Sequence, residues 1–236
     1  MENASRLSEK GMHMSSYYAG WRARHYNIRW RTFTKRTLAE VLAMIDEARL
    51  RRVPEQLGHP PRVLDVACGT GVLLRKLLER VPGAEVYGVD ASADMLEQAH
   101  AALKNQPHVR LEQAEVGDGE TANLPYAAQT FDLITCTNAL HDMPDPVAVL
   151  TGLGRLLAPE GQLVVEDFAR RKPPFPWFAV EWLARRIEGG YVRAYTLGEA
   201  RSLCMQAGLR VAYERAFKVD WLWHGWALRT TAASSG

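Results

Sequence analysis

Apolar and amphipathic segments alternate between residues 62 and 114, and this alternation constrains the fold more than any other feature of the sequence. Patterns typical of strands occupy Arg62–Val66, Glu85–Val89 and Val109–Ala114, and helical patterns lie between them at about 71–80 and 92–105. Strands that alternate with helices form a parallel sheet covered by helices on both faces. We therefore expect a doubly wound α/β fold.

The same alternation continues towards the end of the chain. Further strands are predicted at Phe131–Thr135, Gln162–Asp167, Arg210–Ala216 and Val219–Arg229, with helices at Pro146–Leu157 and Leu197–Ala207. The last two strands are close in sequence and should pair as a hairpin, which introduces one antiparallel strand. The prediction is a mostly parallel, seven-stranded sheet.

The beginning of the chain and one internal stretch depart from this pattern. Residues 1–14 are polar and predict a flexible tail, and residues 15–58 predict a helical lid segment that includes one helix over Thr34–Arg52. A proline-rich break predicts a second lid inserted at about 170–192. The remainder of 59–236 forms the main domain in this prediction.

Composition excludes several classes of function. A formal net charge of +2 and a pI near 8.5 are too mild for a nucleic-acid-binding protein. Cys68, Cys136 and Cys204 are far apart, so neither disulfides nor a metal site is expected. The start of the chain has no apolar signal region and no run is long enough to span a bilayer, which predicts a cytoplasmic protein. The oligomeric state stays open.

A glycine-rich turn follows the first predicted strand and opens a helix. Gly69 and Gly71 would let the backbone approach a ligand at the carboxyl edge of the sheet, where open α/β sheets bind their ligands. Nineteen residues after Gly71, the next strand ends in Asp90, whose carboxylate can accept hydrogen bonds from a ribose diol. Together these features predict a ligand that contains adenosine.

A dinucleotide-dependent oxidoreductase would use the same glycines and the same ribose acid. Its usual fingerprint continues to a third glycine, whereas this chain has Leu74 or its neighbours there. Asp65, just before the turn, would repel a pyrophosphate but suit the ammonium of a methionine-like group. The pattern favours a ligand that is cationic at this end, with an NAD(P)-dependent oxidoreductase as the alternative.

The run Leu64–Gly71 resembles motif I of class I S-adenosylmethionine-dependent methyltransferases, and the resemblance extends over about residues 62–168. The segment 117–126 is similar to the family's adenine-binding loop, with Asp118 as the match and Glu120 as the alternative. The segment 131–145 resembles the fourth strand and its following loop. Residues 155–163 resemble the turn before the fifth strand, with Glu160 in place of a glycine.

This resemblance implies a Rossmann-like methyltransferase fold and S-adenosylmethionine as the cofactor. The branch that it resembles includes quinone-biosynthesis and phospholipid N-methyltransferases, which implies methyl transfer to an O, N, C or S atom of a small or lipid-like molecule by in-line displacement. A non-catalytic cofactor-binding scaffold is a further alternative. The residues that would bind the cofactor are Asp65, Ala67, Cys68, Gly69, Gly71, Asp90, Ala91, Met95, Asp118, Gly119, Thr137 and Asn138.

Methyl transfer from a sulfonium needs little more than a nucleophile held in line. If the acceptor must lose a proton, His141 is the candidate base, because it follows the fourth strand beside the expected methyl position. The alternative is a loop histidine that packs on the cofactor. Asp142 is a second candidate and could equally cap a turn.

Aromatic side chains in the two lid segments are candidates for the walls of the acceptor site. Electron-rich rings attract a sulfonium or an ammonium, although the same rings could form ordinary core. The second lid segment also carries Arg185 and Arg186 close to Trp182, a combination that would suit a helix in a membrane interface. We favour a lid for this segment. The candidates are Tyr17, Tyr18, Trp21, Tyr26, Trp30, Trp177 and Trp182.

Overall fold

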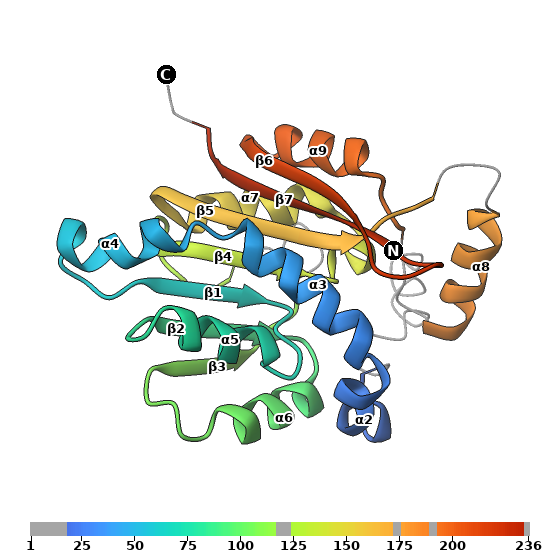
Figure 1. The fold of residues 1–236 in the computed structure, drawn as a ribbon, viewed down its shortest axis with the longest axis horizontal. Coiled ribbons are helices and arrows are strands. Elements are labelled where there is room, and N and C mark those ends of the chain that lie inside the picture. Colours follow the sequence, from blue (N-terminus) through green and yellow to red (C-terminus); the bar gives the residue numbers. More distant parts are fainter. Residues whose placement is uncertain (1–17, 117–123, 172–175, 189–192, 234–236) are drawn as a thin grey trace, which may run out of the picture.

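A seven-stranded sheet forms the centre of the computed structural model, which describes residues 18–116, 124–171, 176–188 and 193–233. The strands lie in the order β3-β2-β1-β4-β5-β7-β6 (Figure 1). β1 to β5 run parallel, and β7 is antiparallel to both of its neighbours. The predicted mostly parallel sheet with one antiparallel strand is confirmed. The strands are β1 (Arg62–Val66), β2 (Glu85–Asp90), β3 (Val109–Gln113), β4 (Phe131–Thr137), β5 (Leu157–Phe168), β6 (Leu209–Lys218) and β7 (His224–Ala232).

Helices cover both faces of the sheet and produce two apolar layers. One layer packs α7 and α9 against side chains such as Leu64, and the other packs α3, α4, α5 and α6 against side chains such as Val63. Successive residues of a strand face opposite sides, so the unbroken apolar runs of β1 and β4 supply both layers. The helices are α2 (Trp21–Arg29), α3 (Arg31–Met44), α4 (Glu47–Leu57), α5 (Val72–Arg80), α6 (Ala93–Leu103), the 3-10 turn η1 (Leu140–Asp142), α7 (Pro146–Leu156), α8 (Trp177–Glu188) and α9 (Leu197–Gln206).

The single helix predicted over Thr34–Arg52 is wrong, because the structure has two helices that meet at Ile45 and Asp46. The Asp46 side chain accepts a hydrogen bond from the Arg49 backbone N–H and begins α4 as an N-cap. The Asp46 backbone N–H in turn donates to the side chain of Gln162 at the start of the buried part of β5. A contact across 116 residues therefore sets the break.

The last strand begins later than predicted, at His224 rather than at Val219. The Asp220 carboxylate accepts hydrogen bonds from the backbone N–H groups of Leu222 and Trp223, both at 2.7 Å, and so closes a turn between β6 and β7. Conversely, β5 begins at Leu157, five residues before the predicted Gln162. Neither shift alters the topology. Within the described part of the chain, no helix combines the length and the apolar character that crossing a membrane requires.

Candidate functional site

The glycine-rich turn leaves β1 at its carboxyl end with three residues in the left-handed region, Ala67, Gly69 and Gly71. A Cβ atom on Gly71 would lie 2.9 Å from the Leu103 side chain, so α5 can start against α6 only with glycine there. Nothing lies within 4 Å of the position where Gly69 would carry a Cβ. The Gly69 backbone is therefore open to a ligand, and the positive φ of Ala67 is the kind of strain that accompanies binding sites.

Asp90 ends β2 beside this turn, as predicted. Its carboxylate accepts hydrogen bonds from the Gly69 N–H at 2.8 Å and from the Ser92 N–H at 2.9 Å. A carboxylate has about four lone-pair directions, so two remain for a diol. Burial raises the pKa of Asp90, and its two backbone donors oppose that shift. Asp90 thus holds the turn in shape and keeps capacity for a further ligand.

Asp65 lies inside the sheet edge, with 1% of its surface exposed. Its Oδ1 accepts a hydrogen bond from the Thr135 hydroxyl at 2.6 Å, and no cation pairs with it among the described residues. Its pKa is raised to about 7: burial is the largest cause, the Thr135 hydroxyl opposes it, and the charge of Asp90 adds to the rise. A buried acid without a cation fits an ammonium group from a ligand.

The other predicted cofactor residues that the structure describes lie on or after the ends of β1, β2 and β4 and at the start of α6. Cys68 and Met95 are buried, and Ala91 accepts a hydrogen bond from the Gln113 side chain at 2.9 Å. Thr137 ends β4, and Asn138 follows it with a φ of 50°. Asp118 and Gly119 lie outside the described residues, as does Glu120. One acid without a cation, one acid with spare acceptor capacity and an open glycine backbone suit an aminoacyl nucleoside such as S-adenosylmethionine.

The N-terminal segment docks on this region (Figure 1). The Asn27 side chain on α2 accepts a hydrogen bond from the Thr70 hydroxyl of the glycine-rich turn at 2.8 Å. The Ser92 hydroxyl donates to the Tyr18 carbonyl at 2.8 Å, and the Gly20 N–H donates to the Asp94 carboxylate. Three polar contacts therefore hold residues 18–27 against the turn and the start of α6.

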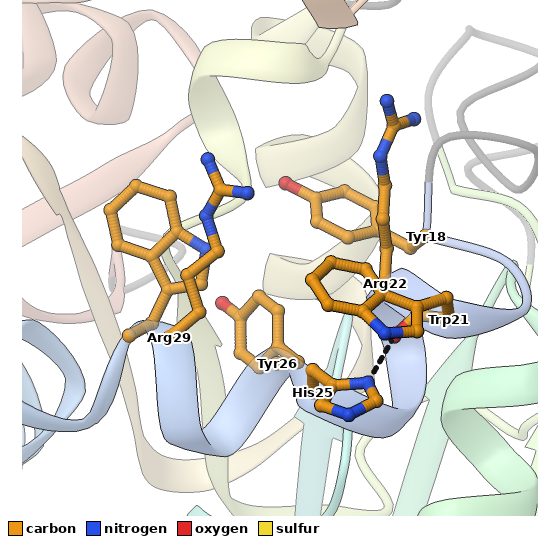
Figure 2. A pocket seen from close by; sticks show the side chains of 7 residues that line it. Tyr18, Trp21, Arg22, His25, Tyr26 and Arg29 are labelled. Carbon is orange, nitrogen blue, oxygen red and sulfur yellow. Dashed lines mark hydrogen bonds between the residues drawn. The ribbon is translucent and has the colours of Figure 1, made fainter.

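Four of the predicted acceptor residues line one pocket on this segment (Figure 2). The rings of Tyr18 and Tyr26 meet edge to face with centroids 6.0 Å apart, and His25 stacks on Trp21 at 4.4 Å. Tyr17 lies outside the described residues. The residues lining the pocket are Tyr18, Trp21, Arg22, His25, Tyr26, Arg29 and Trp30.

His141 is buried in η1 between two carboxylates. Its Nδ1 lies 2.9 Å from Asp167 Oδ1, its backbone N–H donates to Asp167 Oδ2 at 2.8 Å, and its Nε2 lies 3.2 Å from Asp142 Oδ2. Burial lowers the pKa of His141, but the charges of Asp167 and Asp142 outweigh burial and raise it well above its usual value. The arrangement favours an imidazolium that donates to both acids.

A second group of rings lies at the carboxyl end of β5. Phe168 packs against His141 with ring centroids 4.5 Å apart, and Trp223 lies 5.5 Å from Phe168. Trp223 also meets Trp177 of α8 at 6.2 Å and Phe33 of α3 at 6.1 Å. We name these four rings, Phe33, Phe168, Trp177 and Trp223, the aromatic cluster. Only Trp177 was among the predicted acceptor residues.

Trp182 is not part of the aromatic cluster. Its side chain is 61% exposed, and the Arg186 guanidinium lies over it at 5.5 Å. Phe33, Phe168 and Trp223 were missed because their rings meet only through the pairing of distant segments. The polar residues Asn27, Thr135 and Asp167 were missed for the same reason. Of these three polar residues, only Thr135 could have been found from the sequence, because it lies on β4, the strand that pairs with β1.

Comparison with known proteins gives consistent matches. The methyltransferase domain family matches residues 60–191, more than half of the chain. A ubiquinone biosynthesis O-methyltransferase of Neisseria meningitidis serogroup A is 31% identical over 158 residues, 64% of this chain and 64% of that protein. A demethylmenaquinone methyltransferase of Deinococcus radiodurans is 38% identical over 116 residues, 48% of this chain and 46% of that protein. The chain thus matches less than two thirds of the length of either relative.

A solved structure has the same fold. An S-adenosylmethionine dependent methyltransferase from Mesorhizobium loti superimposes with a TM-score of 0.65 at 20% identity, over 81% of this chain and 95% of that one. The motif order along residues 62–168 and the match over residues 60–191 agree with this fold. This chain belongs to the class I S-adenosylmethionine-dependent methyltransferase family.

Proposed function

We propose that this chain transfers a methyl group from S-adenosylmethionine to a small, quinone-like acceptor by in-line displacement. One observation carries the proposal: the buried Asp65 carboxylate, which pairs with no cation among the residues that the structure describes, and the Asp90 carboxylate flank an open glycine turn at the carboxyl edge of the sheet. An ammonium group and a ribose diol occur together in S-adenosylmethionine and match these two acids. When bound, S-adenosylmethionine supplies a methyl group that its sulfonium already activates.

The residues of this chain then have three tasks. Asp65 holds the ammonium and Asp90 accepts from the ribose hydroxyls, which fixes the cofactor at the ends of β1 and β2. The segment held by Asn27, Tyr18 and Gly20 covers the glycine turn and excludes water. Correct placement accounts for most of the rate, since effective molarity alone can lower a barrier by about 7–11 kcal/mol.

A flat, largely apolar acceptor suits the walls beside this site. The aromatic cluster provides edge and face contacts next to His141 and the end of β4, and such pairs favour an aromatic guest. The two curated relatives act, by their names, in ubiquinone biosynthesis and on demethylmenaquinone. Both points support a quinone-like or similarly lipid-like molecule.

His141 remains our candidate for a base only in its neutral form. An imidazolium that donates to Asp167 and Asp142 cannot accept a proton, so we propose that at neutral pH His141 holds these acids in place. We expect a contribution as base only at alkaline pH, where the ring loses its proton. Asp142 is buried, and its Oδ1 has no hydrogen-bond partner among the described residues, so it keeps one acceptor position for a substrate.

A transfer assay tests the proposed function directly. S-adenosylmethionine labelled in its methyl group is incubated with the purified chain and methoxyhydroquinone, and label in the extracted product is counted. At a cofactor concentration near the wild-type Kd, we expect transfer that Asp65→Asn strongly lowers and that the matched surface variant Glu85→Gln preserves. Reduction of NAD by the chain with no label transfer would show that the proposal is wrong.

A further inference from the structure

The end of β5 carries a buried acid that no part of the proposed cofactor site uses. Glu166 is fully buried, and neither of its carboxyl oxygens has a hydrogen bond of good geometry among the described residues. The nearby Asn138 backbone N–H only partly opposes the rise that burial causes in the pKa of this carboxyl. More than nine in ten buried polar groups in proteins are hydrogen-bonded, and an unpartnered carboxyl costs stability. Within the described part of the chain, such a carboxyl has acceptor capacity left for a donor from a ligand.

Glu166 lies at the level of the cofactor site. It stands opposite Thr137, the last residue of β4, in the parallel register, and its backbone carbonyl accepts from the Asn138 N–H at 2.9 Å. Asn138 was predicted to contact the cofactor, and its φ of 50° lies in the left-handed region, which asparagine tolerates better than most residues. The acid therefore sits one strand away from the expected methyl position.

The side chains of Glu166 and Asn138 lie on the same face of the sheet. Val164, two residues before Glu166, packs with Leu38 of α3, and alternation along a strand places Glu166 on that face too. The Asn138 amide donates to the Thr37 hydroxyl of α3 at 3.4 Å, whereas the buried Asn138 Oδ1 has no hydrogen-bond partner in the part of the chain that the structure describes. Two unsatisfied acceptors thus lie on the α3 side of the strand ends.

The aromatic cluster borders this polar pair. Phe33 is one helical turn before Thr37 on α3, so both project from the same side of that helix, and Phe33 meets Trp223 at 6.1 Å. Trp223 in turn contacts Phe168, two residues after Glu166. Acceptor oxygens on one side and aromatic rings on the other match a flat molecule that bears a hydrogen-bond donor.

We propose that Glu166 and Asn138 form the subsite that binds a hydroxyl or amine N–H of an aromatic methyl acceptor. The identity of the ligand as a methyl acceptor rests on the proposed function. The binding preference of the subsite can be measured without methyl transfer. With this subsite, the enzyme should discriminate between an acceptor with a free donor hydrogen and the same ring without one, because a buried acceptor left unpaired weakens binding.

Equilibrium binding tests the subsite without any turnover. Methoxyhydroquinone and its fully O-methylated ether are titrated separately, under nitrogen, into the full chain saturated with S-adenosylhomocysteine. We expect the wild type to bind the hydroquinone at least about tenfold more tightly than the ether. Glu166→Leu should lose this preference and keep its affinity for S-adenosylhomocysteine within about twofold, and Glu166→Gln should retain part of it.

Thermal unfolding separates this role from a structural one. Replacing an unpartnered buried acid by leucine should raise Tm by about 2–4 °C, so lost discrimination cannot be attributed to misfolding. Glu160→Gln on the same strand, where the carboxylate is exposed and pairs with Arg49, is the matched control and should leave the preference unchanged. A wild type that binds both probes equally, or a Glu166→Leu variant that discriminates as well as the wild type, would overturn the subsite. Discrimination without any methyl transfer would instead refute the proposed function and leave the subsite standing.

Discussion

The Thr135 hydroxyl of β4 donates a hydrogen bond of 2.6 Å to the Asp65 carboxylate of β1, inside the sheet. The two residues are opposite each other in the parallel register. This contact offsets only part of the cost of burying the acid, and the Asp65 pKa stays at about 7. The structure therefore keeps an acid that titrates near neutrality and that a cationic ligand would ionise fully.

Cofactor affinity should depend on pH through Asp65. The ammonium binds the ionised acid, so affinity should fall as pH decreases below about 7, approaching tenfold per pH unit. Calorimetric titration between about pH 5.5 and pH 7.5 measures this. 5′-Methylthioadenosine, which lacks the amino acid part, should show no such slope, and neither should Asp65→Asn with the whole cofactor. A flat profile for the wild type would remove the ammonium role of Asp65.

Asp65 also makes the stability of the cofactor-free protein depend on pH. Its folded pKa of about 7 lies above the usual aspartate pKa of 3.8, so the folded state holds this proton more tightly than the unfolded chain. This contribution to stability is complete below about pH 3.8 and is lost as pH rises through about 7. Asp65→Asn should therefore be more stable than the wild type at about pH 8, by thermal unfolding.

Asp90→Ala should weaken S-adenosylmethionine binding by more than about tenfold, since a charge-assisted hydrogen bond is worth about 1.5–3 kcal/mol. It should also lower Tm, because the N–H groups of Gly69 and Ser92 would lose their acceptor. Calorimetry and thermal unfolding measure the two effects. Asp90→Asn, which keeps one carbonyl acceptor, should be intermediate. Unchanged affinity in Asp90→Ala would exclude the ribose role.

The contact between Asn27 and Thr70 predicts that cofactor and N-terminal segment stabilise each other. S-adenosylmethionine should slow tryptic cleavage at Arg22, Arg24 and Arg29, because it would order the turn on which α2 docks. Asn27→Ala should reduce this protection, whereas Asn105→Ala, a matched change at an exposed position, should not. Equal cleavage rates with and without cofactor would contradict a covering role for this segment.

His141→Asn tests whether His141 holds Asp167 and Asp142 in place or removes a proton from the methyl acceptor. Loss of the imidazolium between Asp167 and Asp142 should lower Tm by several degrees at neutral pH, because both acids stay buried. Because the pKa of His141 is raised in the folded state, the contribution of its imidazolium to stability is complete below about pH 6.5, the usual histidine pKa. It is lost as the pH rises through the raised pKa of the folded state. Unchanged Tm with strongly reduced methyl transfer would instead favour a base. His100→Asn, at an exposed position on α6, is the control.

The sequence was sufficient for the mostly parallel seven-stranded sheet and for placing Gly69 and Asp90 at one edge of it, because both depend on local patterns. The runs before Gly69 and before Asp90 predict two strand ends, and parallel strands bring such ends to one edge. Strand Arg62–Val66 and the start of α7 at Pro146 agree residue for residue with the prediction.

The acceptor side was not predictable in the same way. The break at Asp46 depends on Gln162, and the place of Trp223 depends on the turn closed by Asp220. Glu166 and Asp167 are adjacent in sequence but serve opposite faces of the sheet, which becomes visible only once α3 and η1 are in position. Contacts between distant segments carry this information, and no local pattern does.

Paired calorimetric titrations of the purified chain with S-adenosylmethionine and with NAD test the central claim most directly. We predict saturable binding of S-adenosylmethionine that Asp65→Asn weakens by at least about tenfold at pH about 7.5, and no heat of binding with NAD. Saturable binding of NAD together with no binding of S-adenosylmethionine would contradict the account.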